Sequence, residues 1–457
     1  MNKQKKLIPL VFMLFLLAYL LHQNTVQSRP NLIILSLDTL RGDSVGYMGY
    51  VRNTSPALDE VAEHAYIYTK AFSHAPRTTP SHITLFTSLY PSQHLVPEYS
   101  SWNQSYALSP EATTLTQLLN RSGYRCAAFT GGGNVAPETG LGRGFHAYET
   151  CDFPCYLPRL SSFISENEGN PFFLFIHTYE IHSPYTPPES YVNYFGSDYG
   201  GGITVNKTLL MFEAEKQEKS IHDVYFSYVD RENEQDIFRL KQLYDAEIRY
   251  SSDVLVSRLI GELREHGLYE NTLLIITSDH GEEFMEHGGL EHWRLYNEHI
   301  HVPLIIKLPY QRKQKKVKQY VGLIDVAPTV LDYLDISTPG SMQGVNLLEV
   351  NESFNRPLFS ERITNLDAEC LFQKAMIHPP HKYVWCPLTG YEKVYDLSKD
   401  PGELNPNSGV GARRLVELRR AFFDWMNHTL HTSLPPTKLM QPSPQTRERL
   451  RKLGYLN

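Results

Sequence analysis

The sequence predicts an α/β fold, in which a doubly wound, mainly parallel sheet is flanked by helices and followed by a small C-terminal subdomain with an antiparallel sheet. Apolar segments of strand length lie near residues 31–37, 124–130, 171–177, 272–278 and 302–308. Helical patterns separate these segments, and strands that alternate with helices are typical of a parallel sheet covered on both faces. The 457 residues, of which 41% are hydrophobic, suffice for one large core and a smaller appended unit.

The pattern of residues 1–28 predicts a signal peptide or an N-terminal membrane anchor. Basic residues precede an apolar segment from Leu7 to Leu21, which is shorter than the roughly 20 residues that a spanning helix needs. Few small residues suited to cleavage follow, and this favours an anchor that is kept. The positive-inside rule then places the rest of the chain outside the cytoplasm.

The strand pattern divides the remaining chain in two. Residues 29–348 form the main domain, and its polar segment 193–234 predicts an insertion near the mouth of the site. Residues 349–457 form the C-terminal subdomain. Within it we expect an antiparallel hairpin from Lys374 to Leu397 and a last helix from about Ala412 to Leu430.

The cysteines agree with an oxidising compartment. Cys151 and Cys155 are spaced to close a small loop, with zinc binding as the weaker alternative. Cys370 and Cys386 are placed to bridge two strands of the hairpin, and Cys126 lies in a predicted buried strand.

The charge of the chain argues against one class of partner. The formal net charge is −7 at pH 7, whereas proteins that bind nucleic acid without sequence preference are generally basic. We therefore expect no nucleic-acid partner.

The segment Ala75-Pro-Arg-Thr-Thr-Pro-Ser-His-Ile-Thr-Leu-Phe-Thr-Ser-Leu-Tyr-Pro91 resembles the nucleophile segment of the sulfatase family, in the alkaline phosphatase superfamily. In that family a Cys or Ser is oxidised to formylglycine. Here Thr78 occupies the position, and a secondary alcohol cannot be oxidised to an aldehyde. The resemblance therefore implies that Thr78 acts as an unmodified hydroxyl nucleophile, which suits phosphoryl transfer.

Two further segments resemble strands of the same family that end in metal ligands. Asp38 ends the apolar run that begins at Asn31, and Asp279 and His280 follow a second apolar run. Ligands bind at the carboxyl ends of strands in open α/β sheets. These residues and Thr78 are therefore expected to enclose one divalent cation, and the imidazole favours zinc or manganese over calcium.

Histidines complete the resemblance. His182 stands in a Pro-rich loop and is the candidate for contact with the leaving group or an oxyanion, and His292, four residues before Tyr296, matches a residue that contacts substrate. The expected substrate-binding residues are Arg77, His82 and His177. His82 departs from the family pattern, which has Arg at that position.

Three functions follow from the resemblance. The first is a metal-dependent hydrolase or transferase that acts on phosphoesters through Thr78. The second is a sulfuric ester hydrolase that works without formylglycine, and the third is an inactive binding protein on the same fold. In the first two the partner is an anionic phosphate or sulfate ester, carried on a glycan or a lipid, and the N-terminal segment adds contact with a membrane.

Overall fold

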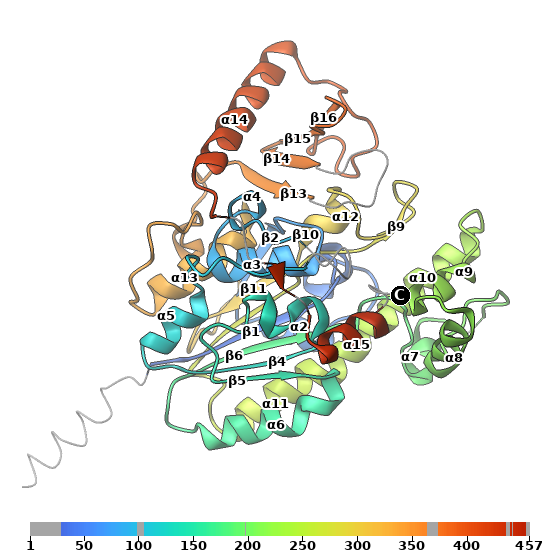
Figure 1. Cartoon of the computed structure of the whole chain (residues 1–457), viewed down its shortest axis with the longest axis vertical. Helices are drawn as coiled ribbons and strands as arrows, with labels where there is room; N and C mark the ends of the chain where they lie inside the picture. Colours follow the sequence, from blue (N-terminus) through green and yellow to red (C-terminus); the bar gives the residue numbers. More distant parts are fainter. Residues whose placement is uncertain are drawn as a thin grey trace, which may run out of the picture.

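The structure is a computed structural model that describes residues 29–97, 105–196, 198–362, 373–435, 439–440 and 442–453. Within this part of the chain, a nine-stranded sheet runs through the centre of the main domain, in the order β10-β2-β11-β7-β1-β6-β4-β5, with β12 paired to β2 (Figure 1). Its strands are β1 (Asn31–Leu37), β2 (Tyr66–Phe72), β4 (Arg125–Thr130), β5 (Ala147–Thr150), β6 (Phe172–Thr178), β7 (Thr272–Thr277), β10 (His301–Val302), β11 (Leu304–Lys307) and β12 (Lys315–Gly322).

The five strands that the apolar segments predict are all present. β7, β1, β6, β4 and β5 pair in parallel, whereas β11 pairs antiparallel with both β7 and β2. The predicted mainly parallel sheet is therefore confirmed. Its antiparallel pairs lie on the β2 side of the centre.

Burial of β1 on both faces explains its continuous apolar sequence. Ile33 and Leu35 belong to one hydrophobic core and Leu32 and Ile34 to another, because side chains alternate between the faces of a strand. The first core is closed by α2 (Pro56–Ala62), α6 (Phe153–Glu166), α10 (Glu234–Tyr250) and α11 (Ser257–Glu265). The second is closed by α3 (Thr78–Thr87), α5 (Leu115–Arg121) and α13 (Val326–Tyr333).

The predicted insertion is helical. It contains the end of α7 (Glu189–Phe195), then α8 (Lys207–Gln217) and α9 (Ile221–Ser227), which project at one side of the domain beside α10 (Figure 1). A π-helical segment, Ser251–Val256, joins α10 to α11.

A four-stranded antiparallel sheet forms the C-terminal subdomain, as predicted. Its strands are β13 (Leu358–Glu361), β14 (Lys374–His378), β15 (His381–Trp385) and β16 (Glu392–Asp396), and they lie in that order. Helix α14 (Ala412–His431) packs on this sheet, where Trp425 stacks on Phe359 with ring centroids 3.9 Å apart. After α14, helix α15 (Pro444–Lys452) returns to the main domain.

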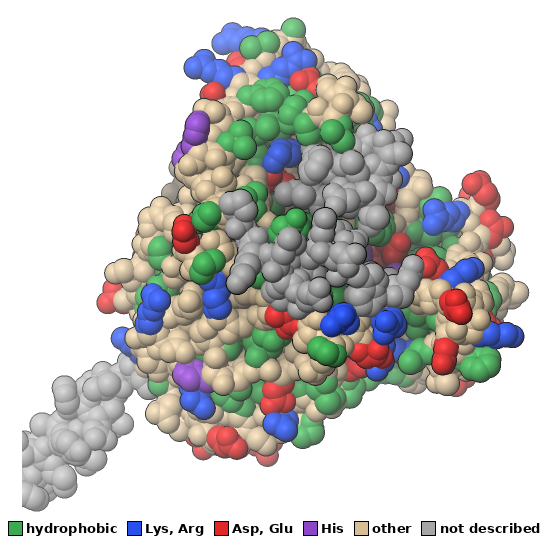
Figure 2. All heavy atoms as spheres, viewed as in Figure 1, with side chains coloured by type: hydrophobic (Ala, Val, Ile, Leu, Met, Phe, Trp, Pro, Cys, Tyr) green, Lys and Arg blue, Asp and Glu red, His purple; other side chains and the backbone are tan. Residues whose placement is uncertain are grey.

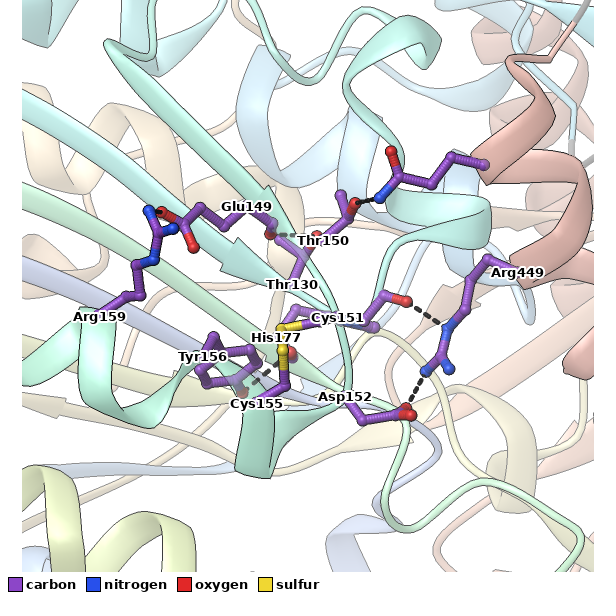
Figure 3. The surroundings of a disulfide bond; sticks show 12 residues. Thr130, Glu149, Thr150, Cys151, Asp152, Cys155, Tyr156, Arg159, His177 and Arg449 are labelled. Carbon is purple, nitrogen blue, oxygen red and sulfur yellow. Dashed lines mark hydrogen bonds and ion pairs between the residues drawn. A yellow bond between two sulfur atoms is a disulfide. The ribbon is translucent and has the colours of Figure 1, made fainter.

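The cysteine predictions are confirmed where the structure describes them. Cys151 and Cys155 form a disulfide at the start of α6 (Figure 3), and Cys126 is free and buried. Cys370 lies outside the described residues, as does the predicted N-terminal anchor. Among the residues described, no helix is long and apolar enough to cross a membrane.

The visible surface carries both signs of charge. Figure 2 shows Lys and Arg side chains interspersed with Asp and Glu over the face drawn.

Truncation of a core side chain in β1 should destabilise the protein. Leu35→Ala removes a fully buried side chain, and we expect it to lower the free energy of unfolding by about 2–5 kcal/mol. Leu430→Ala is the matched control, because Leu430 on α14 is 67% exposed. Denaturant unfolding measures both, and an equal effect of the two substitutions would contradict this account of the core.

Candidate active site

The candidate site lies at the carboxyl ends of three adjacent strands. β7, β1 and β6 are neighbours in the sheet. Asp38 directly follows β1, Asp279 lies two residues beyond β7, and His177 is the penultimate residue of β6. Parallel pairing brings these ends to one edge, so three segments far apart in the sequence meet there.

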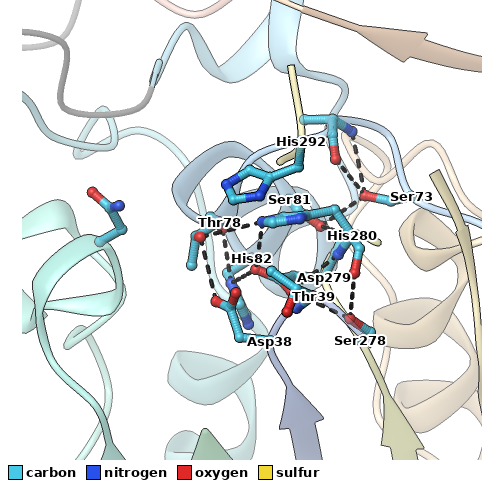
Figure 4. Close-up of polar contacts among 12 residues, drawn as sticks. Asp38, Thr39, Ser73, Thr78, Ser81, His82, Ser278, Asp279, His280 and His292 are labelled. Carbon is cyan, nitrogen blue, oxygen red and sulfur yellow. Dashed lines mark hydrogen bonds and ion pairs between the residues drawn. The ribbon is translucent and has the colours of Figure 1, made fainter. Parts of the chain in front are cut away.

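Thr78, the first residue of α3, lies against this edge (Figure 4). Its Oγ1 is 3.3 Å from Asp38 Oδ2 and 3.4 Å from His280 Nε2. The hydroxyl of Ser81, in the first turn of α3, donates to the carbonyl of Asp279 at 2.7 Å and fixes the helix on the end of β7. The hydroxyl of Thr78 is thus held at a helix N-terminus, an environment that favours negative charge.

Asp38, Asp279 and His280 can hold one metal ion. Each is buried, and their ligand atoms lie within 4.8 Å of one another. Oδ2 of Asp279 has no hydrogen-bond partner among the described residues. A buried carboxylate oxygen without a donor is costly, and hard oxygen and imidazole ligands suit a divalent cation. Asp38, Asp279 and His280 therefore fit the divalent cation that the sequence analysis predicts.

The protonation states agree with this use. Burial acts to raise the pKa of Asp279, but the imidazoles of His280 and His82 outweigh it and hold that pKa below its usual range. Burial lowers the pKa of His280 to about 4. An ionised carboxylate and a neutral imidazole are the forms in which these residues bind metals.

His82 lies beneath Thr78. Its Nδ1 donates to the carbonyl of Thr78 at 2.8 Å, and its Nε2 lies 3.0 Å from the hydroxyl of Ser36. His177 places Nε2 3.1 Å from Asp38 Oδ2. Both rings are fully buried. Through these contacts, His82 and His177 help to hold Thr78 and Asp38 in place.

Four imidazoles form a row that leads away from Thr78. Ring centroids are 4.3 Å apart for His280 and His292, 5.1 Å for His292 and His182, and 5.3 Å for His182 and His222. The sequence predicts the first three as site residues. The structure brings them together.

The proton on His182 can be assigned from its partner. Nδ1 of His182 lies 2.7 Å from the carbonyl of Ser183, which can only accept, so Nδ1 carries the proton. Burial and the neighbouring His222 lower the pKa of His182 to about 3. The ring is therefore neutral in this structure, with Nε2 as its accepting atom.

His222 is a site residue that the sequence analysis missed. It lies on α9, in the insertion, and donates Nε2–H to the carbonyl of Ser183 at 2.7 Å. Its Nδ1 lies 2.8 Å from Glu291 Oε1, and His222 in turn lowers the pKa of that carboxyl against the effect of burial.

Arg77 lies at the edge of the site. Its guanidinium stacks over the ring of Trp293, 4.1 Å from the centroid. Its side chain is 8% exposed. This cation–π contact orients Arg77 beside Thr78 and does not neutralise its positive charge.

A family model described as Sulfatase matches residues 30–336. The chain is 26% identical over 366 residues to arylsulfatase K from Gallus gallus, an alignment that covers 70% of this chain and 66% of that protein. The chain thus spans about two thirds of the length of this relative.

Solved structures show the same fold. A 2-O GAG sulfatase aligns with a TM-score of 0.71 and 21% identity, over 92% of this chain and 96% of the other. The phosphonate monoester hydrolase of Agrobacterium radiobacter aligns with a TM-score of 0.69 and 20% identity, over 91% and 100% of the two chains.

Replacement of one ligand should weaken metal binding. Asp279→Asn keeps the shape of the side chain but removes its charge, so we expect affinity for zinc and manganese to fall by about tenfold or more. Equilibrium dialysis followed by metal analysis measures this independently of any activity. Asp424→Asn, at an exposed position on α14, is the control. Unchanged metal uptake by Asp279→Asn would reject the ligand assignment.

Proposed function

The chain belongs to the sulfatase family, and within that family we propose that it is a metal-dependent hydrolase or transferase that acts on phosphoesters through Thr78. The observation that carries the proposal is the position of the Thr78 hydroxyl, within 3.4 Å of both Asp38 Oδ2 and His280 Nε2. A carboxylate and an imidazole converge there on an alcohol that cannot become an aldehyde. Such a hydroxyl is an activated nucleophile.

In the first step, Oγ1 of Thr78 attacks the phosphorus of the ester. The bond between Oγ1 and phosphorus forms while the bond from phosphorus to the alcohol oxygen breaks, which leaves a phosphothreonine. Asp38 Oδ2, which accepts the hydrogen bond of the Thr78 hydroxyl, is the first acceptor of its proton. His182 is neutral, so the leaving alcohol takes its proton from solvent water, and His182 returns a proton to the solvent after the second step, which balances the protons over the cycle.

In the second step, water or a second alcohol attacks the phosphothreonine. The bond to Oγ1 breaks, and Thr78 recovers its proton. His182 is placed to take the proton of the attacking group, because its Nδ1–H is engaged by Ser183 and Nε2 is its basic atom. Water as the attacking group gives hydrolysis, and an alcohol gives transfer.

The remaining predicted residues support these steps. A divalent cation held by Asp38, Thr78, Asp279 and His280 would stabilise negative charge on the transferring group. His292 lies between His280 and His182, and we assign it to contact with a substrate oxygen. Arg77 supplies a fixed positive charge for the anionic ester.

His82 and His177 receive narrower roles than direct contact with the substrate. Both nitrogens of His82 are engaged by Thr78 and Ser36, so we assign His82 to positioning of the nucleophile. His177 contacts Asp38 and is assigned to the orientation of that carboxylate. A partner of this kind fixes a ligand before the metal binds.

A sulfate ester is the second candidate substrate. The names of the relatives support it, since one is an arylsulfatase and another a 2-O GAG sulfatase. The phosphonate monoester hydrolase with the same fold supports phosphorus chemistry. Residues 29–348 are then the catalytic domain, and an N-terminal anchor or signal peptide would place it outside the cytoplasm.

Loss of the hydroxyl should abolish turnover. We expect Thr78→Ala to lower kcat/KM by about 10³-fold or more, because the covalent step is lost. Thr78→Ser keeps a hydroxyl and should retain turnover within about tenfold of the wild type. Steady-state kinetics on the metal-loaded protein measures both, with melting temperatures as the check on folding. Activity of Thr78→Ala near that of the wild type would reject the nucleophile.

The substrate class can be decided with a panel of aryl sulfates, phosphate monoesters and phosphate diesters. A phosphoryl group carries more negative charge on its equatorial oxygens than a sulfuryl group and gains more from the cation. We therefore expect phosphoesters to turn over faster, and a phosphorylated Thr78 to be found by mass spectrometry after acid quenching. Robust sulfatase activity with no phosphoesterase activity would establish the second candidate instead.

A further inference from the structure

A cavity of about 200 Å³ lies beside the histidine row. We call it the side cavity. The loop that follows β6 forms one wall, and α8, α9, α10 and α15 contribute the others. Its described lining includes Glu180, His182, Lys207, Glu247, Arg449 and Lys452.

The side cavity and the candidate active site share His182. That residue lines the cavity, and its ring lies 5.1 Å from that of His292. Beyond His182, the side cavity would hold the alcohol portion of a substrate whose ester group lies at Thr78.

One carboxyl in this wall is incompletely paired. Glu247, on α10, is only 2% exposed. Its Oε1 accepts the backbone N–H of Thr186 at 2.7 Å, but its Oε2 has no hydrogen-bond partner among the described residues. Native proteins rarely leave a buried carboxyl oxygen without a donor, so the side chain is suited to a donor that arrives with a ligand.

A second carboxyl, that of Glu180, lines the same cavity. Burial raises the pKa of Glu247, and the proximity of Glu180 raises it further. Burial likewise raises the pKa of Glu180, while Lys207 opposes the shift. Two carboxyls that share a confined space disfavour each other's charge, and a cation between them would relieve this repulsion.

The basic side chains of the cavity differ in how they are used. Arg449 donates to the carbonyl of Gly131 at 2.6 Å and pairs with Asp152 (Figure 3). It therefore fixes α15 against the loop after β4. Lys207 on α8 and Lys452 on α15 also line the cavity and are exposed, so they provide positive charge at the rim, where an anionic ester would enter.

We propose that the side cavity binds a primary ammonium group carried by the alcohol portion of the substrate, through Glu247 and Glu180. The substrate is then an ester of an amine-bearing alcohol, either a small amino alcohol or an amino sugar. This inference rests on the proposed function for the ester chemistry. The binding of the amine itself does not depend on turnover.

Calorimetric titration of the full chain tests the proposal directly. The probes are ethanolamine and glucosamine, each paired with its uncharged counterpart, ethylene glycol and glucose. We expect at least one amine to bind at least tenfold more tightly than its counterpart. The amine that binds more tightly identifies the source of the ammonium group. Equal affinity for amine and counterpart in both pairs would overturn the proposal.

Variants identify the residues. Glu247→Gln keeps the acceptor for Thr186 and should weaken amine binding by about tenfold or more. Glu180→Gln, at a less buried position, is the second variant and keeps the test decisive if the first folds poorly. Glu265→Gln, exposed on α11, is the control and should bind as the wild type does. Amine binding that survives both cavity substitutions would overturn the assignment.

The two proposals fail separately. Thr78→Ala should lose turnover yet bind the amine with wild-type affinity. In contrast, Glu247→Gln should lower the ratio of kcat/KM for an amine-bearing ester to that for an amine-free ester by about tenfold. If Glu247→Gln keeps both the wild-type selectivity and the wild-type affinity for the amine, the side cavity has no part in substrate recognition. The role of Thr78 would be unaffected by that result.

Discussion

The placement of two buried carboxylates at the ends of neighbouring strands is the constraint on which the rest of the site depends. Asp38 and Asp279 are at most 1% exposed, and burial of like charges at close range is unfavourable. The protein offsets part of this with donors. His280 gives its backbone N–H to Asp279 Oδ1 at 3.0 Å, and His177 contacts Asp38 at 3.1 Å. The imidazoles around the two carboxylates thus lie where they can interact with this negative charge.

The strands that position the site could be predicted from the sequence, because each strand is set by a local apolar pattern. Each of the strands that ends near Thr78 is a continuous apolar segment, and the residue that follows it is fixed by the strand itself. Resemblance to the sulfatase family then identified Thr78 and its neighbours. The role of His82 could not be inferred in this way, because its partners, Ser36 and the Thr78 carbonyl, become visible only in three dimensions.

The residues that sequence analysis missed come from elements that do not follow the repeating pattern. His222 lies in the insertion, and no spacing in that polar segment indicates that it meets Ser183 and Glu291. Glu247 lies on α10 among other charged residues, and its burial depends on packing against the loop that carries Thr186. Insertions and long-range packing decide these contacts, and both are weakly encoded in local sequence patterns.

The π-helical segment Ser251–Val256 gives α10 and α11 different helical phases. One additional residue in a turn rotates everything beyond it by about 100° around the helix axis. α10 therefore presents Glu247 to the side cavity while α11 keeps its own apolar face on the sheet. Loss of a single residue in this wide turn would bring both helices into one phase and rotate the apolar face of α11 away from the sheet.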